Sequence, residues 1–270
     1  MKQEFSLAQL TVLHASPSEL AKIAAETGYD FFSIRQIYMG LPEEPDFDLS
    51  KNKKLLSETK AVMANTGIRL LDIELARIVF EIDPAKYEPA FAIAAELGGK
   101  SVISSIWTEN RDLYLSRFAQ VCDLAAQYGL SVELEYVPIS AVKNLAGVVN
   151  VLNEVNRQNA GILVDIHHFH RAGDKPEDLA RLPRKWFHMV HLCDAKAEIP
   201  ANLDEMKHIL REDRDYPGEG GIDIKSILAN IPLVPYSTEL PKLSFSDKYG
   251  YKEHARKCLD SSKKYLNICN

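Results

Sequence analysis

Short apolar runs separated by longer helical stretches recur eight times along this chain, and this alternation constrains its fold more than any other feature. Each run is rich in Val, Ile, Leu and Phe, which is typical of strands buried on both faces of a parallel sheet. The intervening segments carry helix signals, such as the start at Ser16-Pro17-Ser18-Glu19 and the stop at Gly28. We expect strands at residues 5–12, 31–35, 68–73, 101–106, 130–136, 161–166, 187–192 and 233–239.

Eight strands that alternate with helices predict an α/β protein with one parallel sheet covered by helices. Eight strands close naturally into a (β/α)₈ TIM barrel, which needs about 250 residues. The chain has 270 residues, so we expect a single barrel domain over residues 1–270. The alternative is an open, doubly wound sheet, which a glycine-rich turn after the first strand would favour. The segment Leu13-His14-Ala15-Ser16-Pro17 is not such a turn.

Charge and cysteine content indicate the partners and the compartment. The formal net charge is −6 and no run of five or six lysines or arginines occurs, so we expect no nucleic-acid partner. The four cysteines, at positions 122, 193, 258 and 269, form no Cys-x-x-Cys pair and suit reduced thiols. The first residues do not resemble a signal peptide, and no stretch reaches the roughly 18 apolar residues of a membrane span. We expect a cytoplasmic protein without a membrane partner, either a monomer or a homo-oligomer.

The sixth apolar run ends in a cluster of polar side chains. Gly161 to Val164 is followed by Asp165 and then by three histidines within five residues. A carboxylate at the end of a buried strand needs a group that compensates its charge. In parallel α/β proteins, the carboxyl ends of the strands are where ligands bind. This segment therefore indicates a ligand site.

Three other late strands end in the same way. Because side chains alternate along a strand, Glu135, His191 and Glu239 would each face the barrel interior, as would Asp165. Three carboxylates and an imidazole in one barrel mouth would repel each other unless a cation neutralised them. A set of oxygen donors with one nitrogen suits Mn²⁺, Mg²⁺, Co²⁺ or Zn²⁺. We expect these four residues to bind one divalent metal ion.

The residues leave alternatives open at this point. One or two of the four could be salt-bridged rim residues instead of metal ligands. Glu133 shares the parity of Glu135, which we prefer because it lies closer to the open end of the barrel. His188 competes with His191 but falls on the opposite parity.

Short motifs around these positions resemble the xylose-isomerase-like barrels, the sugar phosphate isomerase/epimerase superfamily. The resemblance covers nearly the whole chain and rests on Leu134-Glu135, Asp165-x-x-His168, His191-Leu-Cys-Asp194, Pro217-Gly-Glu-Gly220 and Glu239. It implies a metal-dependent barrel that acts on a sugar, a sugar phosphate or a polyhydroxy acid. Ketose epimerases, isomerases, dehydratases and type IV abasic-site endonucleases share this frame, so the motifs do not identify the substrate. Some relatives, dehydratases among them, have Gln in place of His191, which favours an epimerase or isomerase.

The resemblance also implies catalytic roles. The family's epimerases place the glutamates of strands five and eight on opposite faces of the substrate, so Glu135 and Glu239 would each be a metal ligand and an acid/base catalyst. One removes the proton α to the carbonyl and the other returns one from the far side, while the metal ion stabilises the enediolate. His168 matches a family histidine near the substrate oxygens, with a rim position as the alternative. We expect His167 and His170 to be surface or packing residues.

Substrate contacts are expected from other positions near the strand ends. Glu74 ends the third strand, and Lys196 lies just beyond the seventh. Arg171 could bind a carboxylate or phosphate, and Trp107 could stack on a sugar face; an exposed arginine and a packed tryptophan are the alternatives. The segment Pro217-Gly218-Glu219-Gly220-Gly221 is either a phosphate-binding turn or a flexible connection.

We therefore expect a metal-dependent isomerase or epimerase that acts by proton transfer α to a carbonyl. The alternative on the same frame is a hydro-lyase, a 3-dehydroshikimate-type or inosose-type dehydratase, in which water leaves after the proton is removed. An abasic-site endonuclease would need more histidines on the first strands than His14 alone. A barrel that has lost catalysis and only binds ligands would hold no divalent metal tightly.

Overall fold

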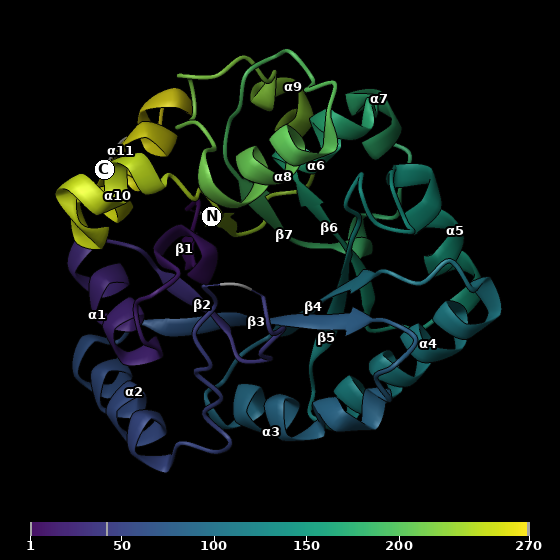
Figure 1. Ribbon diagram of the computed structural model, residues 1–270, viewed down its shortest axis with the longest axis horizontal. Helices are drawn as coiled ribbons and strands as arrows, with labels where there is room; N and C mark the ends of the chain where they lie inside the picture. Colours follow the sequence, from purple (N-terminus) through teal and green to yellow (C-terminus); the bar gives the residue numbers. More distant parts are fainter. Residues whose placement is uncertain (1, 42, 269–270) are drawn as a thin grey trace.

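A computed structural model describes residues 2–41 and 43–268 of the chain. Within them, eight parallel strands form a closed barrel in sequence order, with β1 paired to β8, and helices surround it (Figure 1). The predicted (β/α)₈ barrel is therefore confirmed. The strands are β1 (Phe5–Ala8), β2 (Phe31–Arg35), β3 (Arg69–Ile78), β4 (Ser101–Ile106), β5 (Ser131–Glu135), β6 (Ala160–Asp165), β7 (Phe187–Leu192) and β8 (Tyr236–Thr238).

The helices begin and end at residues with clear capping roles. In the first helix, the Ser16 side chain accepts a hydrogen bond from the Glu19 amide and the Glu19 carboxylate accepts one from the Ser16 amide, while Gly28 ends the helix in the left-handed region at φ 93°. No helix among the described residues is long and apolar enough to cross a membrane. The helices are α1 (Pro17–Thr27), α2 (Lys53–Thr66), α3 (Glu88–Glu96), α4 (Arg111–Gln127), α5 (Leu145–Val155), α6 (Ile166–Ala172), α7 (Pro176–Leu179), α8 (Leu203–Glu212), α9 (Ile224–Ala229), α10 (Leu243–Tyr249) and α11 (Tyr251–Tyr265), with short 3₁₀ turns η1 (Gln9–Val12), η2 (Pro84–Tyr87) and η3 (Arg184–Trp186).

Two strand boundaries and two helices differ from the expected elements. The first apolar run divides into β1 and the turn η1, where the Thr11 hydroxyl donates to the carbonyl of Thr238 at 2.7 Å. The third strand continues to Ile78, so Glu74 lies within β3 instead of ending it. Helices α6 and α10 were not expected from the sequence. Helix α6 begins directly after Asp165, whose carboxylate accepts a hydrogen bond from the amide of His168.

Most of the buried apolar side chains form one cluster between the strands and the helices and a second cluster inside the barrel. Val132, Leu134 and Val190 belong to the large cluster that includes helix residues such as Leu152. A separate small cluster, formed by Phe31, Leu71, Ile103, Leu163 and Met189, fills the barrel interior. Side chains therefore alternate between the two clusters as the strand periodicity predicts. Leu163 and Met189 lie two residues before Asp165 and His191, which places a polar layer directly beyond the inner apolar one.

His188 departs from the parity that its neighbours follow. Its Nδ1 lies 2.8 Å from the Glu133 carboxylate, on the inward-facing side. The pairing of β6 with β7 shifts register between Ile162 and Val164, and such a shift allows two consecutive residues to turn toward one face. Parity alone therefore does not predict where the His188 ring points, but the group of potential metal ligands at the strand ends contains His191 and not His188, as expected.

The described cysteines, Cys122, Cys193 and Cys258, are free and buried, as expected for reduced thiols. Cys269 lies outside the described residues. The thiol nearest to the candidate site is that of Cys193, which follows β7. It lies 3.4 Å from the guanidinium of Arg214.

Candidate metal centre

Four buried side chains converge at the carboxyl ends of the last four strands. Glu135 ends β5, Asp165 ends β6, His191 is the penultimate residue of β7, and Glu239 directly follows β8. One potential donor atom from each lies within 4.8 Å of those from the other three. None of the four side chains is more than 10% exposed. The structure thus brings the four expected ligands to one place.

The His191 ring lies at the centre of this group. Its Nδ1 is 3.4 Å from Glu239 Oε2, 3.5 Å from Glu135 Oε1 and 3.8 Å from Asp165 Oδ2. Both ring nitrogens and Glu135 Oε1 are buried without a hydrogen-bond partner among the described residues. Buried polar atoms without partners are costly, so their presence points to a missing ligand. Three oxygen donors and one nitrogen donor fit a divalent ion.

The charges of these side chains influence one another. Burial alone would lower the pKa of His191, but the carboxylates of Glu239 and Glu135 outweigh burial and raise this pKa well above its usual range. Burial would raise the pKa of Glu239, but His191 and Arg214 hold it well below its usual range. Burial would likewise raise the pKa of Asp165, and Arg214 holds it below the ordinary value. Asp165 and Glu239 are therefore ionised at neutral pH and suited to bind a cation.

Arg214 also lies at the site, although it was not expected there from the sequence. It is fully buried, and its guanidinium lies 2.7 Å from Asp165 Oδ2 and 3.0 Å from Glu239 Oε2. A further hydrogen bond of 2.9 Å joins Nη1 to the backbone carbonyl of Glu239. In the sequence, Arg214 belongs to the charged run from Arg211 to Asp215, which reads as an exposed segment. Only the fold shows that this arginine turns inward.

Glu74 lies near the four ligands from the opposite half of the barrel. Its Oε2 accepts a hydrogen bond of 3.1 Å from Arg35 Nε, and its Oε1 is buried without a partner. Arg35 also lies 3.7 Å from Glu44. Burial raises the pKa of Glu74 to about 6, against the effect of Arg35, and the charge of Glu239 adds to the rise. Glu74 therefore offers a free carboxylate oxygen close to the ligand group.

Helix α6 buries the histidines that follow Asp165. His168 is 3% exposed, its amide donates to Asp165 Oδ1 at 2.9 Å, and its Nδ1 has no partner among the described residues. His167 is also 3% exposed, and neither of its ring nitrogens has a partner there. Burial, together with the charge of Arg214, lowers the pKa of His167 well below its usual range, so its ring is neutral. His167 was expected to be either a surface residue or a packing residue. Its burial shows that it is a packing residue.

Three residues that were expected to contact the substrate form bonds to other parts of the protein. Arg171 is buried, and its Nη1 donates to the Lys196 carbonyl at 2.9 Å and contacts His170 Nδ1 at 2.8 Å. The Lys196 ammonium is exposed and pairs with Asp215 at 3.1 Å. Trp107 is 37% exposed, and its indole N–H donates to the Ser105 hydroxyl. Among the described residues, no hydrogen bond or ion pair joins Trp107 or the Lys196 ammonium to the four ligands.

The segment Pro217–Gly221 already holds an anion that belongs to the protein. The carboxylate of Asp194, which is 1% exposed, accepts hydrogen bonds from the amides of Gly218, Gly220 and Ile222 at 2.9, 3.1 and 3.1 Å. A side chain on Gly220 would overlap this carboxylate. The backbone amides that could have bound a phosphate are thus occupied, and the segment is a fixed turn.

Comparison with known proteins gives this geometry a context. A family model described as "xylose isomerase-like TIM barrel" matches residues 21–238. The inosose isomerase of Bacillus subtilis (strain 168) is 29% identical over 147 residues, which make up 54% of this chain and 50% of that enzyme. The 3-dehydroshikimate dehydratase of Bacillus anthracis is 30% identical over 83 residues, 31% of this chain and 30% of that enzyme. The matches to these curated relatives therefore span half of their length or less.

Solved structures show the same fold over the whole chain. A crystal structure of the IOLI protein with a bound zinc atom superimposes with a TM-score of 0.80 at 22% sequence identity, covering 98% of both chains. At this level of identity the likeness concerns the fold alone.

Proposed function

This chain belongs to the xylose isomerase-like TIM barrel family, and we propose that it is a divalent-metal-dependent isomerase or epimerase of an unphosphorylated polyhydroxy ketone. The observation that carries the proposal is the buried group of Glu135, Asp165, His191 and Glu239, with donor atoms within 4.8 Å of one another. The similarity to an inosose isomerase supports a cyclic polyol ketone as the substrate.

The same four residues would hold the metal ion. An ion bound there supplies Lewis-acid chemistry, which polarises a carbonyl group and favours loss of the adjacent proton. Mn²⁺, Mg²⁺, Co²⁺ and Zn²⁺ all suit this donor set, and the zinc atom in the IOLI structure agrees with a divalent ion. Arg214 keeps Asp165 and Glu239 ionised and pairs with Asp165 Oδ2 and Glu239 Oε2, which fixes both carboxylates beside His191.

Glu135 and Glu239 are the proposed acid/base pair. They lie at the ends of β5 and β8, three strands apart around a barrel of eight, so they reach a substrate in the mouth from different sides. One carboxylate removes the proton α to the carbonyl, and the other returns a proton from its own side. His168 is the proposed partner of a substrate oxygen, because its Nδ1 is buried and free. Glu74 can accept a hydrogen bond from a substrate hydroxyl through Oε1.

Two observations support a substrate without phosphate. The backbone amides of the turn between β7 and β8 donate to Asp194. The Lys196 ammonium pairs with Asp215. The loop amides and the lysine that could bind a phosphate in this part of a barrel are therefore already used. Nε and Nη2 of Arg171 are buried without a hydrogen-bond partner among the described residues, so they remain available to a substrate oxygen.

A dehydratase is the second candidate, and the match to a 3-dehydroshikimate dehydratase favours it. It would use the same metal ion and the same proton removal, followed by loss of water. His168 would then be the base, since its free Nδ1 lies at the site without being one of the four ligands.

The experiment is a product analysis in heavy water. Metal-loaded protein is incubated with an inosose, with several ketoses and with 3-dehydroshikimate, and the Glu239→Gln variant is the control. An isomerase or epimerase incorporates solvent deuterium into a product that has lost no water. Loss of water from 3-dehydroshikimate would assign the lyase instead. Absence of both reactions across the panel would contradict the proposed function.

A further inference from the structure

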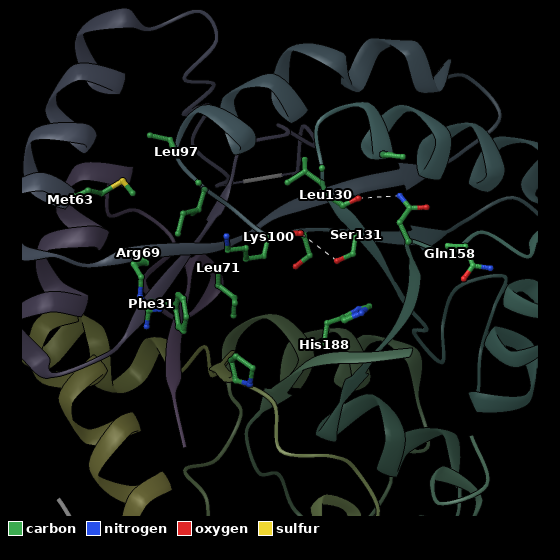
Figure 2. A pocket seen from close by; sticks show the side chains of 17 residues that line it. Phe31, Met63, Arg69, Leu71, Leu97, Lys100, Leu130, Ser131, Gln158 and His188 are labelled. Carbon is green, nitrogen blue, oxygen red and sulfur yellow. Dashed lines mark hydrogen bonds between the residues drawn. The ribbon is translucent and has the colours of Figure 1, made fainter. Parts of the chain in front are cut away.

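A second pocket lies at the other end of the barrel from the candidate metal centre. It has a volume of about 850 Å³ and is lined by residues at the starts of strands, including Phe31 in β2, Arg69 in β3 and Ser131 in β5 (Figure 2). Ser131 is four residues before Glu135, which corresponds to roughly 13 Å along the strand at about 3.3 Å per residue. The pocket is therefore a separate site.

The lining of this pocket differs in charge from the protein as a whole. The chain has a net charge of −6. The described residues that line the pocket nevertheless include Arg69, Lys100 and His188 but no aspartate or glutamate. Arg69 is compensated by an ion pair of 2.6 Å with Glu4. No ion pair or side-chain hydrogen bond involves the ammonium of Lys100 among the described residues.

His188 is held in place by a buried carboxylate. Glu133 is 0% exposed, and its Oε1 lies 2.8 Å from His188 Nδ1 and accepts a hydrogen bond of 2.6 Å from the Ser131 hydroxyl. A side chain at Gly161 would overlap both the Glu133 carboxylate and the His188 ring, so the arrangement depends on that glycine. The hydrogen bond that Glu133 accepts from His188 raises the pKa of His188. Because Nδ1 is engaged, Nε2 is the nitrogen that remains for a ligand.

The opposite side of the pocket is apolar. Figure 2 shows Phe31, Leu71 and Arg69 on one side of the pocket, and Ser131 and His188 on the other. The Arg69 guanidinium lies 4.0 Å from the centre of the Phe31 ring and covers one face of it. A ligand that filled this pocket would thus meet an apolar wall, the Lys100 ammonium, which has no ion-pair partner among the described residues, and the Nε2 side of the His188 ring.

We propose that this pocket binds a small organic carboxylate with a flat apolar body. The carboxylate lies between the Lys100 ammonium and His188 Nε2, and the apolar body packs against Phe31 and Leu71. An inorganic anion would leave the apolar wall unused, and a neutral ring would leave the Lys100 ammonium unpaired. The proposal concerns a different end of the barrel and does not depend on the proposed enzymatic function.

The experiment is a calorimetric titration of the full chain with benzoate, repeated with benzamide and with inorganic phosphate. Each titration is carried out with and without a divalent ion, because benzoate bound to the metal centre would depend on that ion. For a ligand of this size we expect a dissociation constant on the order of 1 mM for benzoate. Benzamide and phosphate should bind at least about tenfold more weakly.

Two variants and a matched control locate the binding. Lys100→Gln should weaken benzoate binding about threefold to fivefold, and His188→Gln about tenfold. Lys100 does not contact Glu133, so its variant remains informative if the loss of His188 impairs folding. Lys53→Gln is the control, since Lys53 is exposed and begins α2, ten residues before the pocket residue Met63. Benzoate binding that is absent, matched by benzamide, or equal in Lys100→Gln and Lys53→Gln would overturn the proposal.

Discussion

Replacing Arg214 by Met tests whether the ion pairs around the candidate metal centre form as described. Arg214 is fully buried and holds Asp165 Oδ2 at 2.7 Å and Glu239 Oε2 at 3.0 Å. Removing one partner of a buried ion pair typically costs about 3–5 kcal/mol, because a charge is left buried without compensation. Here two carboxylates lose the same cation, although burial would then raise their pKa values and let one of them take up a proton. We expect the free energy of unfolding to fall by about 3–5 kcal/mol.

Arg157→Met is the matched control for this substitution. Arg157 also binds a carboxylate through two nitrogens, at 2.6 and 3.0 Å from Asp123, but its side chain is 40% exposed. Exposed ion pairs contribute about 0.2–1 kcal/mol. The comparison therefore separates the effect of burial from the effect of losing a bidentate arginine.

Urea unfolding followed by circular dichroism measures both variants, first with a chelator and then with a saturating divalent ion. The ion supplies positive charge to the same carboxylates, so the deficit of Arg214→Met should become smaller when the ion is present. If Arg214→Met loses no more stability than Arg157→Met, the buried ion pairs do not form as described. A deficit that the ion leaves unchanged would mean that Arg214 and the ion do not share those carboxylates.

Three further predictions address the ligands, the turn between β7 and β8, and the pocket at the other end. Glu239→Gln should lower kcat by about 10²–10⁴-fold, whereas Asp165→Asn should mainly reduce the metal content after gel filtration. Asp194→Ala frees three backbone amides, so inorganic phosphate should raise the melting temperature of this variant and leave that of the wild type unchanged. The pKa of His188 is raised by Glu133, so the stability from this pair is complete below about pH 6.5 and is lost as the pH rises through the raised pKa. Because His188 is 40% exposed, we expect this loss to stay below about 1 kcal/mol and to vanish in His188→Gln.

Each of these predictions has an outcome that contradicts it. Full activity of Glu239→Gln would remove this residue from the acid/base pair. Phosphate that stabilises wild type and Asp194→Ala equally would show that the loop amides are not the binding groups. A wild type and a His188→Gln variant with the same pH dependence of unfolding between about pH 6 and 9 would rule out the charge pairing with Glu133.

The sequence predicted the barrel and the residues that meet at its mouth because both follow from strand periodicity. Eight apolar runs predict eight strands, and a polar residue at the carboxyl end of a parallel strand lies at the same rim as its counterparts. Glu135 and Asp165 could be placed in this way from their position in the chain alone. His191 and Glu239 followed from the same parity, which strands β7 and β8 preserve at those positions.

The residues that the sequence could not place lie in loops or in irregular pairings. Arg214 lies in a charged loop, and tertiary contacts decide which way its side chain points. Strand or helix periodicity gives no information at this position. Asp194 belongs to the motif that follows the seventh strand and was expected to support His191 or to contact the substrate, but only the folded turn shows that three amides surround its carboxylate. The alternation of side chains along a strand puts His188 on the face opposite to that of His191. The register shift between β6 and β7 breaks this alternation. The burial of His167 depends on the short helix α6, which was not expected from the sequence.

Whether Glu135, Asp165, His191 and Glu239 hold a metal ion is decided by the metal content of the purified protein. The protein is stripped with a chelator, reloaded with Mn²⁺ or Zn²⁺, and analysed by elemental analysis alongside a variant in which His191 and Glu239 are replaced by Ala and Gln. We expect one tightly held ion per wild-type chain and none in the variant, since the four donor groups meet at one point. A wild type without a tightly held ion, or a variant that retains it, would show that these four residues are not the metal ligands.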